Sequence, residues 1–244
     1  MSKLENIKCW KDTLRRVSDS CDSIKYCYSD LYIKHRTHKP KYSKTEIRVD
    51  NMDSIDCGIY YQNQGYTPLV LNLADDIIPG GYVHQGLASQ EESLFRRTNL
   101  CTTLIKSMYP ILAEEGIYSP GVSIIKAFDL TLCSDIKSID IISVPGVKYP
   151  VLDSKTKLMN KKDIDIFKTK IRLILLIAIE HKHDCLVLGA LGCGAWTCPP
   201  RQVAELFKEV LSENLYSGMF SLVTFAIIDT KSSKNLDIFV DVLF

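Results

Sequence analysis

The sequence lacks an excess of charge of either sign. Its 244 residues include 30 Lys and Arg against 29 Asp and Glu, a formal net charge of +1. Such a balance offers no electrostatic reason to expect DNA, RNA or a membrane surface as the main partner. The basic segment 34–44 is the candidate for contact with a polyanion. A solvated loop is the favoured interpretation, because charge runs usually face water.

Long hydrophobic runs are also absent. The longest uninterrupted apolar run, 173–179, is far too short to cross a bilayer. The N-terminal segment MSKLENIKCW lacks the pattern of a signal peptide, and there is no internal repeat. We therefore expect a soluble, cytoplasmic protein without a membrane partner. With 46% hydrophobic residues, the chain can bury the core of one large α/β domain.

Paired cysteine spacing is missing as well. The nine cysteines are an odd number and form no CxxC pair. This pattern favours reduced thiols in an intracellular protein over a disulfide framework, and it does not support zinc binding. We expect no metal and no cofactor. Cys193 lies between two glycines without a histidine in a catalytic motif, so we interpret it as a small spacer.

Short β-favouring runs alternate with amphipathic segments along most of the chain. The first 30 residues are typical of one or two amphipathic helices that cover the core. The alternation predicts an α/β fold in which helices sandwich a mixed, mostly parallel sheet. Strands are predicted at 45–49, 68–74, 121–128, 138–144, 185–190 and 220–229, helices at 51–66, 89–108, 163–180 and 201–215, and a strand or short helix at 236–243.

Two glycine-rich loops follow predicted strands. The first contains Pro79, Gly80 and Gly81, and the second is the Gly-Cys-Gly segment 192–194. Because ligands of such sheets bind at the carboxyl ends of strands, we expect one cleft built from both segments. Loops of this kind expose backbone N–H groups that can hold a pyrophosphate. A tight strand-to-helix turn would also use glycines, so this interpretation stays open for each loop alone.

Three polar residues, Gln90, Glu91 and Glu92, come shortly after the first loop. Ser89 is predicted as the N-cap of the next helix, with Glu92 completing a capping box. Acidic residues in a first helical turn also favour the helix dipole, so a purely structural interpretation stands beside a catalytic one. Cleavage of a glycosidic bond needs a carboxylic acid, and burial near another carboxylate raises a glutamate pKa toward a useful range.

Together these motifs resemble the signature of the bacterial-type poly(ADP-ribose) glycohydrolases, a branch of the macrodomain superfamily. The resemblance covers about 45–244. One departure is Tyr82, which stands where the family's loop has a third glycine and which would crowd a sugar or stack beside it. The matching positions are Asn72, Pro79, Gly80, Gly81, Gln90, Glu91, Glu92, 186–190, Gly192, Cys193, Gly194, Trp196, Pro199, Pro200, Val203, Ala204 and Phe207.

The resemblance implies a three-layer α/β/α, macrodomain-like catalytic domain at 45–244, with an N-terminal helical extension at 1–44 packed on the core. It implies a monomeric glycohydrolase that cleaves ribose–ribose O-glycosidic bonds in poly(ADP-ribose), or on ADP-ribosylated proteins, and releases ADP-ribose. Two alternatives remain open because of Tyr82. One is a module that binds ADP-ribose without turnover, and the other is a mono-ADP-ribosyl hydrolase.

By the same resemblance, Glu92 is the catalytic acid, Glu91 positions the ribose being cleaved and Gln90 supports the site. Phe225 is expected either to stack on adenine or to be an ordinary core side chain. Asn72 lies in an apolar strand and needs a partner if buried, either a ribose hydroxyl or a backbone group. The expected substrate-binding residues are Asn72, Gly80, Gly81, Tyr82, Gln90, Gly192, Cys193, Gly194, Ala195, Trp196 and Phe225.

Overall fold

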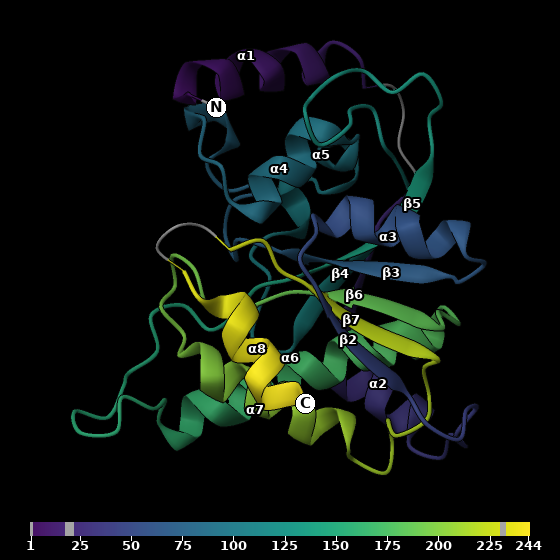
Figure 1. The fold of residues 1–244 in the computed structure, drawn as a ribbon, viewed down its shortest axis with the longest axis vertical. Coiled ribbons are helices and arrows are strands. Elements are labelled where there is room, and N and C mark those ends of the chain that lie inside the picture. Colours follow the sequence, from purple (N-terminus) through teal and green to yellow (C-terminus); the bar gives the residue numbers. More distant parts are fainter. Residues whose placement is uncertain (1, 18–21, 230–232) are drawn as a thin grey trace.

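The computed structural model describes residues 2–17, 22–229 and 233–244 of the chain. Its centre is a seven-stranded sheet with the strand order β1-β4-β5-β3-β6-β7-β2 (Figure 1). Five neighbouring strands from β5 to β2 run parallel, and β4 and β1 add to the β5 side in antiparallel pairs. The strands are β1 (Ile24–Cys27), β2 (Glu46–Asp50), β3 (Pro68–Leu73), β4 (Glu115–Ser123), β5 (Ser138–Val144), β6 (Cys185–Leu188) and β7 (Leu222–Ala226).

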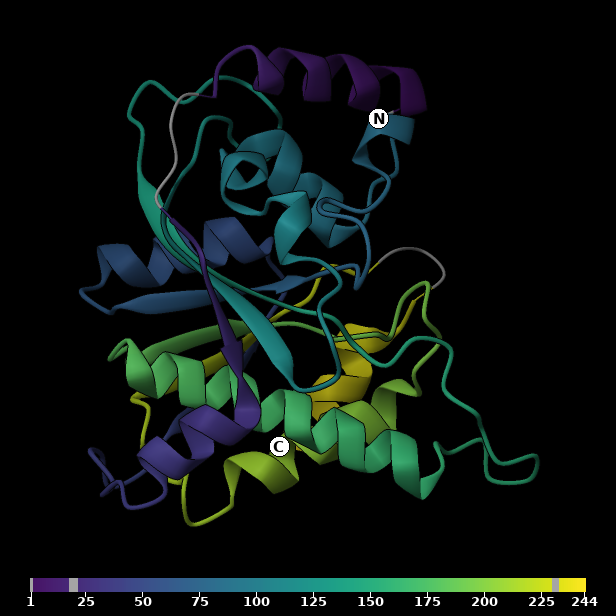
Figure 2. The same cartoon turned by 180° about the vertical axis from the view of Figure 1, so that it is seen from behind.

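Helices cover both faces of the sheet, so the predicted three-layer arrangement is confirmed (Figures 1 and 2). One face carries α3 (Ser54–Asn63), α4 (Gln90–Arg97) and α5 (Leu100–Thr103), with α1 (Lys3–Leu14) lying outside α4. The other face carries α2 (Tyr28–His35), α6 (Lys161–Glu180), α7 (Pro200–Leu211) and α8 (Asn235–Leu243). Two short 3-10 helices, η1 (Val83–Gln85) and η2 (Lys106–Met108), lie in the connections.

The alternation of side chains along the central strand β3 supplies both halves of the core. Leu69 and Leu71 pack with α6 and α7 on one face, and Val70 packs with α3 and α4 on the other. All three side chains are fully buried, as the apolar run that contains them predicts for a central strand. The sheet therefore fixes where the ends of β3 lie, and with them the loop that follows.

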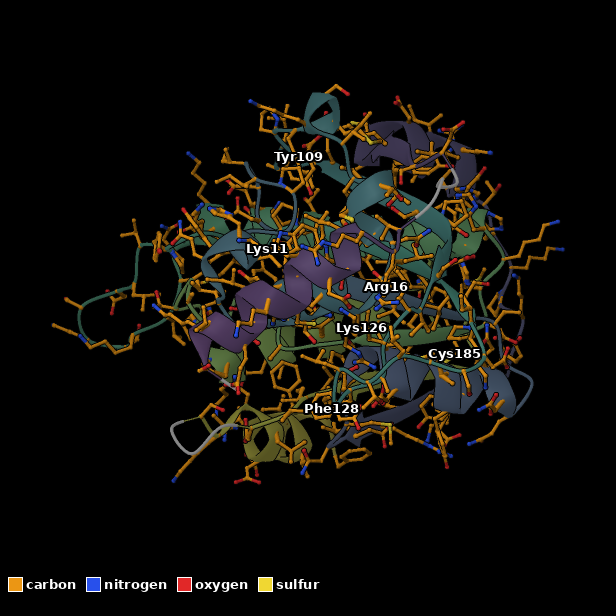
Figure 3. All side chains as sticks on the ribbon, turned by 90° about the horizontal axis from the view of Figure 1, so that it is seen from above. Lys11, Arg16, Tyr109, Lys126, Phe128 and Cys185 are labelled. Atoms are coloured by element: carbon orange, nitrogen blue, oxygen red, sulfur yellow. The ribbon has the colours of Figure 1, made fainter. Side chains whose placement is uncertain are left out.

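The N-terminal region departs from the sequence prediction. Residues 24–27, expected in a helical extension, form the edge strand β1, which pairs with β4. α1 is held over α4 by Lys126, whose buried ammonium donates to the carbonyl of Cys9 (2.9 Å) and to the hydroxyl of Thr13 (2.8 Å). Figure 3 shows Lys126 beside this helix. The first segment of the chain is thus joined to the sheet and to the elements that carry the site.

Two other predicted elements change. The strand expected at 121–128 is β4, which begins at Glu115 and continues through a bulge between Ser119 and Val122. The single helix expected at 89–108 is broken at Thr98, which adopts an extended conformation and bridges to Ile124. The segment 236–243, predicted as a strand or a short helix, lies in the helix α8, so the helical alternative is confirmed. Among the described residues, no helix has the length and apolar character needed to cross a membrane.

Candidate active site

The carboxyl ends of three adjacent parallel strands meet at one edge of the sheet. The first glycine loop follows β3, the segment 145–149 follows β5, and the second glycine loop follows β6. The last two are in close contact, because a Cβ atom built on Gly146 would lie 3.0 Å from the Cα atom of Gly192. The predicted convergence of the two glycine loops is confirmed, and a third segment joins them.

Glu91 is buried at the centre of this edge, with 4% of its surface exposed. Its Oε2 accepts the N–H of Asp75 (2.7 Å), and its Oε1 accepts the N–H of Gly80 (3.2 Å) and the amide of Asn72 (3.4 Å). Burial raises the pKa of the carboxyl group to about 8, and the neighbouring charge of Glu92 acts in the same direction. Glu91 therefore ties the first loop to β3 through both of its oxygens.

Glu92 is equally buried, but its two oxygens differ. Oε1 accepts the backbone N–H of Tyr82 (3.1 Å), whereas Oε2 is buried and finds no hydrogen-bond partner among the described residues. The expected capping box is absent, because the Ser89 side chain makes no cap bond. The Glu92 side chain turns to the loop N–H instead of back to the helix start. One carboxyl oxygen thus has a hydrogen-bond partner, whereas the other has none among the described residues.

The two loop glycines are required by these carboxylates and by α4. Gly81 has a φ of +54°, and a Cβ atom there would lie 2.8 Å from Glu92 Oε1 and 3.3 Å from Glu91 Oε2. Gly80 has a φ of +74°, and its Cβ atom would lie 2.3 Å from the Phe95 ring. Only glycine satisfies both the left-handed backbone and this close approach.

Gln90 fastens the start of α4 to its surroundings. Its amide nitrogen donates to the Ser54 hydroxyl (3.0 Å) and to the carbonyl of Leu71 (2.8 Å), and its carbonyl accepts the N–H of Leu73 (2.9 Å). The three bonds reach the first residue of α3 and two residues at the end of strand β3. Gln90 therefore sets the position of the two glutamates relative to the sheet.

Tyr82 takes the place of a glycine without closing the loop. Its φ of −106° is ordinary for any residue, so a side chain here strains nothing. The side chain is 42% exposed and its ring neighbours His84, with 6.3 Å between centroids. The contact with Glu92 is made by the backbone N–H alone. The aromatic residue therefore preserves the hydrogen bond that positions the carboxyl group.

The second glycine loop presents free backbone donors. Gly192 has a φ of +73°, and its Cβ atom would lie 2.7 Å from the Cys198 sulfur. Within the described part of the chain, the N–H groups of Gly194, Ala195 and Trp196 make no hydrogen bond. Burial raises the pKa of the Cys193 thiol, which keeps it protonated and a poor nucleophile. This loop can hold an anion through its backbone.

Two further residues at this edge of the sheet were not predicted from the sequence. Lys148, in the connection after β5, lies over the Trp196 ring and pairs with Asp76. The hydroxyl of Tyr109 is buried without a hydrogen-bond partner among the described residues, and burial, followed by the charges of Glu91 and Asp75, raises its pKa. Lys148 could have been found from the sequence, because it follows the predicted strand β5 and ligands bind at the ends of such strands. Nothing in the local sequence indicates that Tyr109 belongs to the site.

One predicted contact is wrong. Phe225 is fully buried in the core between the rings of Phe207 (5.1 Å) and Phe239 (5.3 Å), so its ring offers no surface to an adenine. The side chain points to the α7 and α8 face because residues alternate along β7, and the core interpretation is the correct one. Among residues 2–17, 22–229 and 233–244, no group of three or more His, Cys, Asp or Glu side chains is placed to hold a metal ion.

The chain is similar to known proteins in both sequence and structure. The family model described as the catalytic domain of microbial-type PARG, the poly(ADP-ribose) glycohydrolases, matches residues 13–127, which include the first loop and both glutamates. Curated protein sequences give no match.

Two solved structures of glycohydrolases resemble the fold. The enzyme from Thermomonospora curvata shares 21% identity at a TM-score of 0.85, over 97% of this chain and 98% of its own. The enzyme from Deinococcus radiodurans, in complex with ADP-ribose, shares 25% identity at a TM-score of 0.78, over 91% of this chain and 94% of its own. A second Thermomonospora curvata structure contains the inhibitor ADP-HPD.

Proposed function

We propose that this chain is a microbial-type poly(ADP-ribose) glycohydrolase, which hydrolyses poly(ADP-ribose) and releases ADP-ribose. The match of residues 13–127 to the family model and the shared fold of the solved glycohydrolases support the proposal. The bond cleaved is the ribose–ribose O-glycosidic bond. The substrates are poly(ADP-ribose) chains or ADP-ribosylated proteins, and a monomer is sufficient for the candidate site.

Glu92 is the general acid in this proposal, and the observation that carries it is the buried, unpartnered Oε2. A buried carboxyl oxygen without a hydrogen bond loses free energy, on the order of 1–3 kcal/mol, that a substrate atom would restore. The hydrogen bond from the Tyr82 N–H to Oε1 favours this orientation of the carboxyl group. The orientation supports delivery of a proton from Oε2 to the departing glycosidic oxygen.

Glu91 is the positioning residue beside it. Both of its oxygens already accept backbone or amide hydrogens, so neither is free for proton delivery in the described chain. Adjacent residues on a helix point about 100° apart. The two carboxyl groups are therefore not a facing acid and nucleophile pair. One acid protonates the leaving group, and the resulting Glu92 carboxylate then activates a water molecule.

The remaining contacts divide between the two loops. The free N–H groups at 194–196 suit the oxygens of a pyrophosphate, which need donors rather than a single lysine. The Oδ1 of Asn72 is buried without a partner among the described residues, and a ribose hydroxyl would supply the missing donor. Trp196, at the end of the second loop, would flank the ribose. These roles place substrate across the edge where β3, β5 and β6 end.

The test is release of ADP-ribose from purified poly(ADP-ribose), followed over time for the wild type and Glu92→Gln. Glu205→Gln is the matched control, because Glu205 is an exposed glutamate of α7. We expect Glu92→Gln to lose turnover by at least about 10²-fold, in the range for removing a general acid. ADP-ribose binding, measured by calorimetry, should persist. Unchanged turnover in Glu92→Gln would remove Glu92 from the acid's role.

The other outcomes distinguish the alternative functions. Binding of ADP-ribose without release by the wild type would identify a module that binds without turnover. Release from mono-ADP-ribosylated protein but not from the polymer would identify a mono-ADP-ribosyl hydrolase. A wild type that shows no binding and no release would refute the proposal.

A further inference from the structure

Lys148 joins three segments at the edge of the candidate site. Its ammonium nitrogen lies 3.0 Å from Asp76 Oδ1 and 3.5 Å from Asp75 Oδ2, both in the turn that begins the first loop. The same nitrogen lies 5.4 Å from the centroid of the Trp196 ring, at the end of the second loop. A single cation thus contacts both glycine-rich loops, although it belongs to neither.

The backbone around Lys148 brings it to this position. The N–H of Tyr149 donates to the carbonyl of Trp196 (3.2 Å), and Gly146 approaches Gly192 so closely that a side chain there would meet its backbone. The connection after β5 is therefore attached to the second loop on both sides of Lys148. The lysine side chain needs only to extend to reach the first loop.

The other end of the contact leads to the glutamates. Asp75 Oδ1 accepts the N–H groups of Ile77 (2.8 Å) and Ile78 (2.9 Å), which shapes the turn, while Oδ2 faces Lys148. The N–H of Asp75 donates to Glu91 Oε2 (2.7 Å). A shift of Asp75 would therefore also change the hydrogen bond between its N–H and Glu91 Oε2.

The positive charge of Lys148 also affects how an anionic substrate approaches the first loop. Asp75 and Asp76 place two carboxylates in the turn that begins the first loop. A substrate that carries a pyrophosphate must approach these groups, and its negative charge is repelled by theirs. Lys148 neutralises part of that charge at the exposed rim, since its side chain is 37% exposed.

We propose that Lys148 is a positioning residue for substrate binding, which fixes the Trp196 ring against the turn at Asp75 and Asp76 and offsets the carboxylate charge that faces a pyrophosphate. This inference rests on the proposed function for the identity of the substrate. It assigns to Lys148 an effect on binding rather than on the chemical step, because the lysine contacts the two loops and not the free oxygen of Glu92.

The experiment compares Lys148→Met, which keeps the length and the packing on the ring but removes the charge, with Lys148→Arg, which keeps charge and ring contact. Lys155→Met is the control, an exposed lysine of the same connection. All are made in a Trp10→Phe background, so that Trp196 is the remaining tryptophan of the two. The readouts are Trp196 fluorescence, the Kd of ADP-ribose by calorimetry, and kcat and KM on poly(ADP-ribose).

We expect Lys148→Met to change the emission of Trp196 and to raise Kd and KM about tenfold, equivalent to about 1.4 kcal/mol, with kcat changed less than about twofold. In Lys148→Arg, Kd and KM should stay within about threefold of the values for the parent, which is the Trp10→Phe protein. The control Lys155→Met should have the same Kd and KM as the parent. Unchanged emission and Kd in Lys148→Met, or equal losses in the Met and Arg variants, would overturn the inference. A parent that binds ADP-ribose but releases none would refute the proposed function alone, since fluorescence and calorimetry still test Lys148.

Discussion

Replacing Gly81 by alanine tests the position of the Glu92 carboxyl group with the addition of a single carbon atom. The new Cβ atom would lie 2.8 Å from Glu92 Oε1 and 3.3 Å from Glu91 Oε2. The first distance is shorter than real Cβ contacts allow, so the carboxyl group of Glu92 must move by several tenths of an ångström. That movement lengthens its bond of 3.1 Å to the Tyr82 N–H, the bond that fixes Oε2.

The backbone strain of this variant can be separated from its effect on the carboxyl group. Gly81 has a φ of +54°, and an alanine in such a left-handed conformation costs roughly 1–2 kcal/mol. Gly65, in the turn between α3 and β3, has a φ of +91°, but a Cβ atom added there would meet nothing within 4 Å. Gly65→Ala therefore carries a comparable strain without the contact, and it is the matched control.

We expect both variants to lose about 1–2 kcal/mol of unfolding free energy, measured by urea titration. Only Gly81→Ala should also lose activity in the folded state, by about tenfold in kcat, because the carboxyl group moves by a fraction of the 1 Å displacement that costs about 10²-fold. The assay is initial-rate release of ADP-ribose from poly(ADP-ribose) at a temperature where both variants remain folded. Equal kcat values in the two variants would refute the reasoning about Glu92.

Two further predictions concern Glu91 and Tyr82. Folding raises the Glu91 pKa from 4.5 to about 8, so the folded chain keeps a proton that the unfolded chain releases between these values. Wild-type unfolding free energy should therefore fall from pH 4.5 to 8, by at most about 5 kcal/mol, relative to Glu91→Gln, and parallel urea-derived pH profiles would contradict this. Tyr82→Ala should keep kcat within about threefold, because only the backbone N–H contacts Glu92, and a larger loss in steady-state kinetics would show that the phenol takes part.

The local motifs of the site could be predicted from the sequence, because a strand, a glycine loop and a helix start are adjacent in the chain. The sequence could not place Lys148, since its partners Asp76 and Trp196 are distant along the chain and meet only when β3, β5 and β6 lie side by side. Phe225 was ambiguous for a related reason. A buried aromatic residue and a ligand-stacking one look alike until the neighbouring helices are placed.

The errors in the elements have physical causes of the same kind. In β4, Pro120 and Gly121 are typical strand breakers, yet a bulge next to an edge strand accommodates them. β1 is only four residues long, and its pairing with β4 outweighs a weak local preference. At the start of α4, the capping box was displaced because the Tyr82 N–H competes for the Glu92 carboxyl group. In each of these three elements, contacts with residues distant in the sequence outweighed the local sequence preference.

The pairing of β2 with β7 sets the order in which the chain can complete its sheet during synthesis. The two strands are parallel, and the Thr224 hydroxyl of β7 donates to Asp50 of β2, 174 positions earlier (2.7 Å). Until residue 226 has left the ribosome, β2 has no neighbour and β6 has one open edge. Such an edge is a template for pairing with other chains. A nascent chain that stalls before β7 is therefore exposed to misassembly, although β3, β5 and β6, whose ends carry the candidate site, are already made.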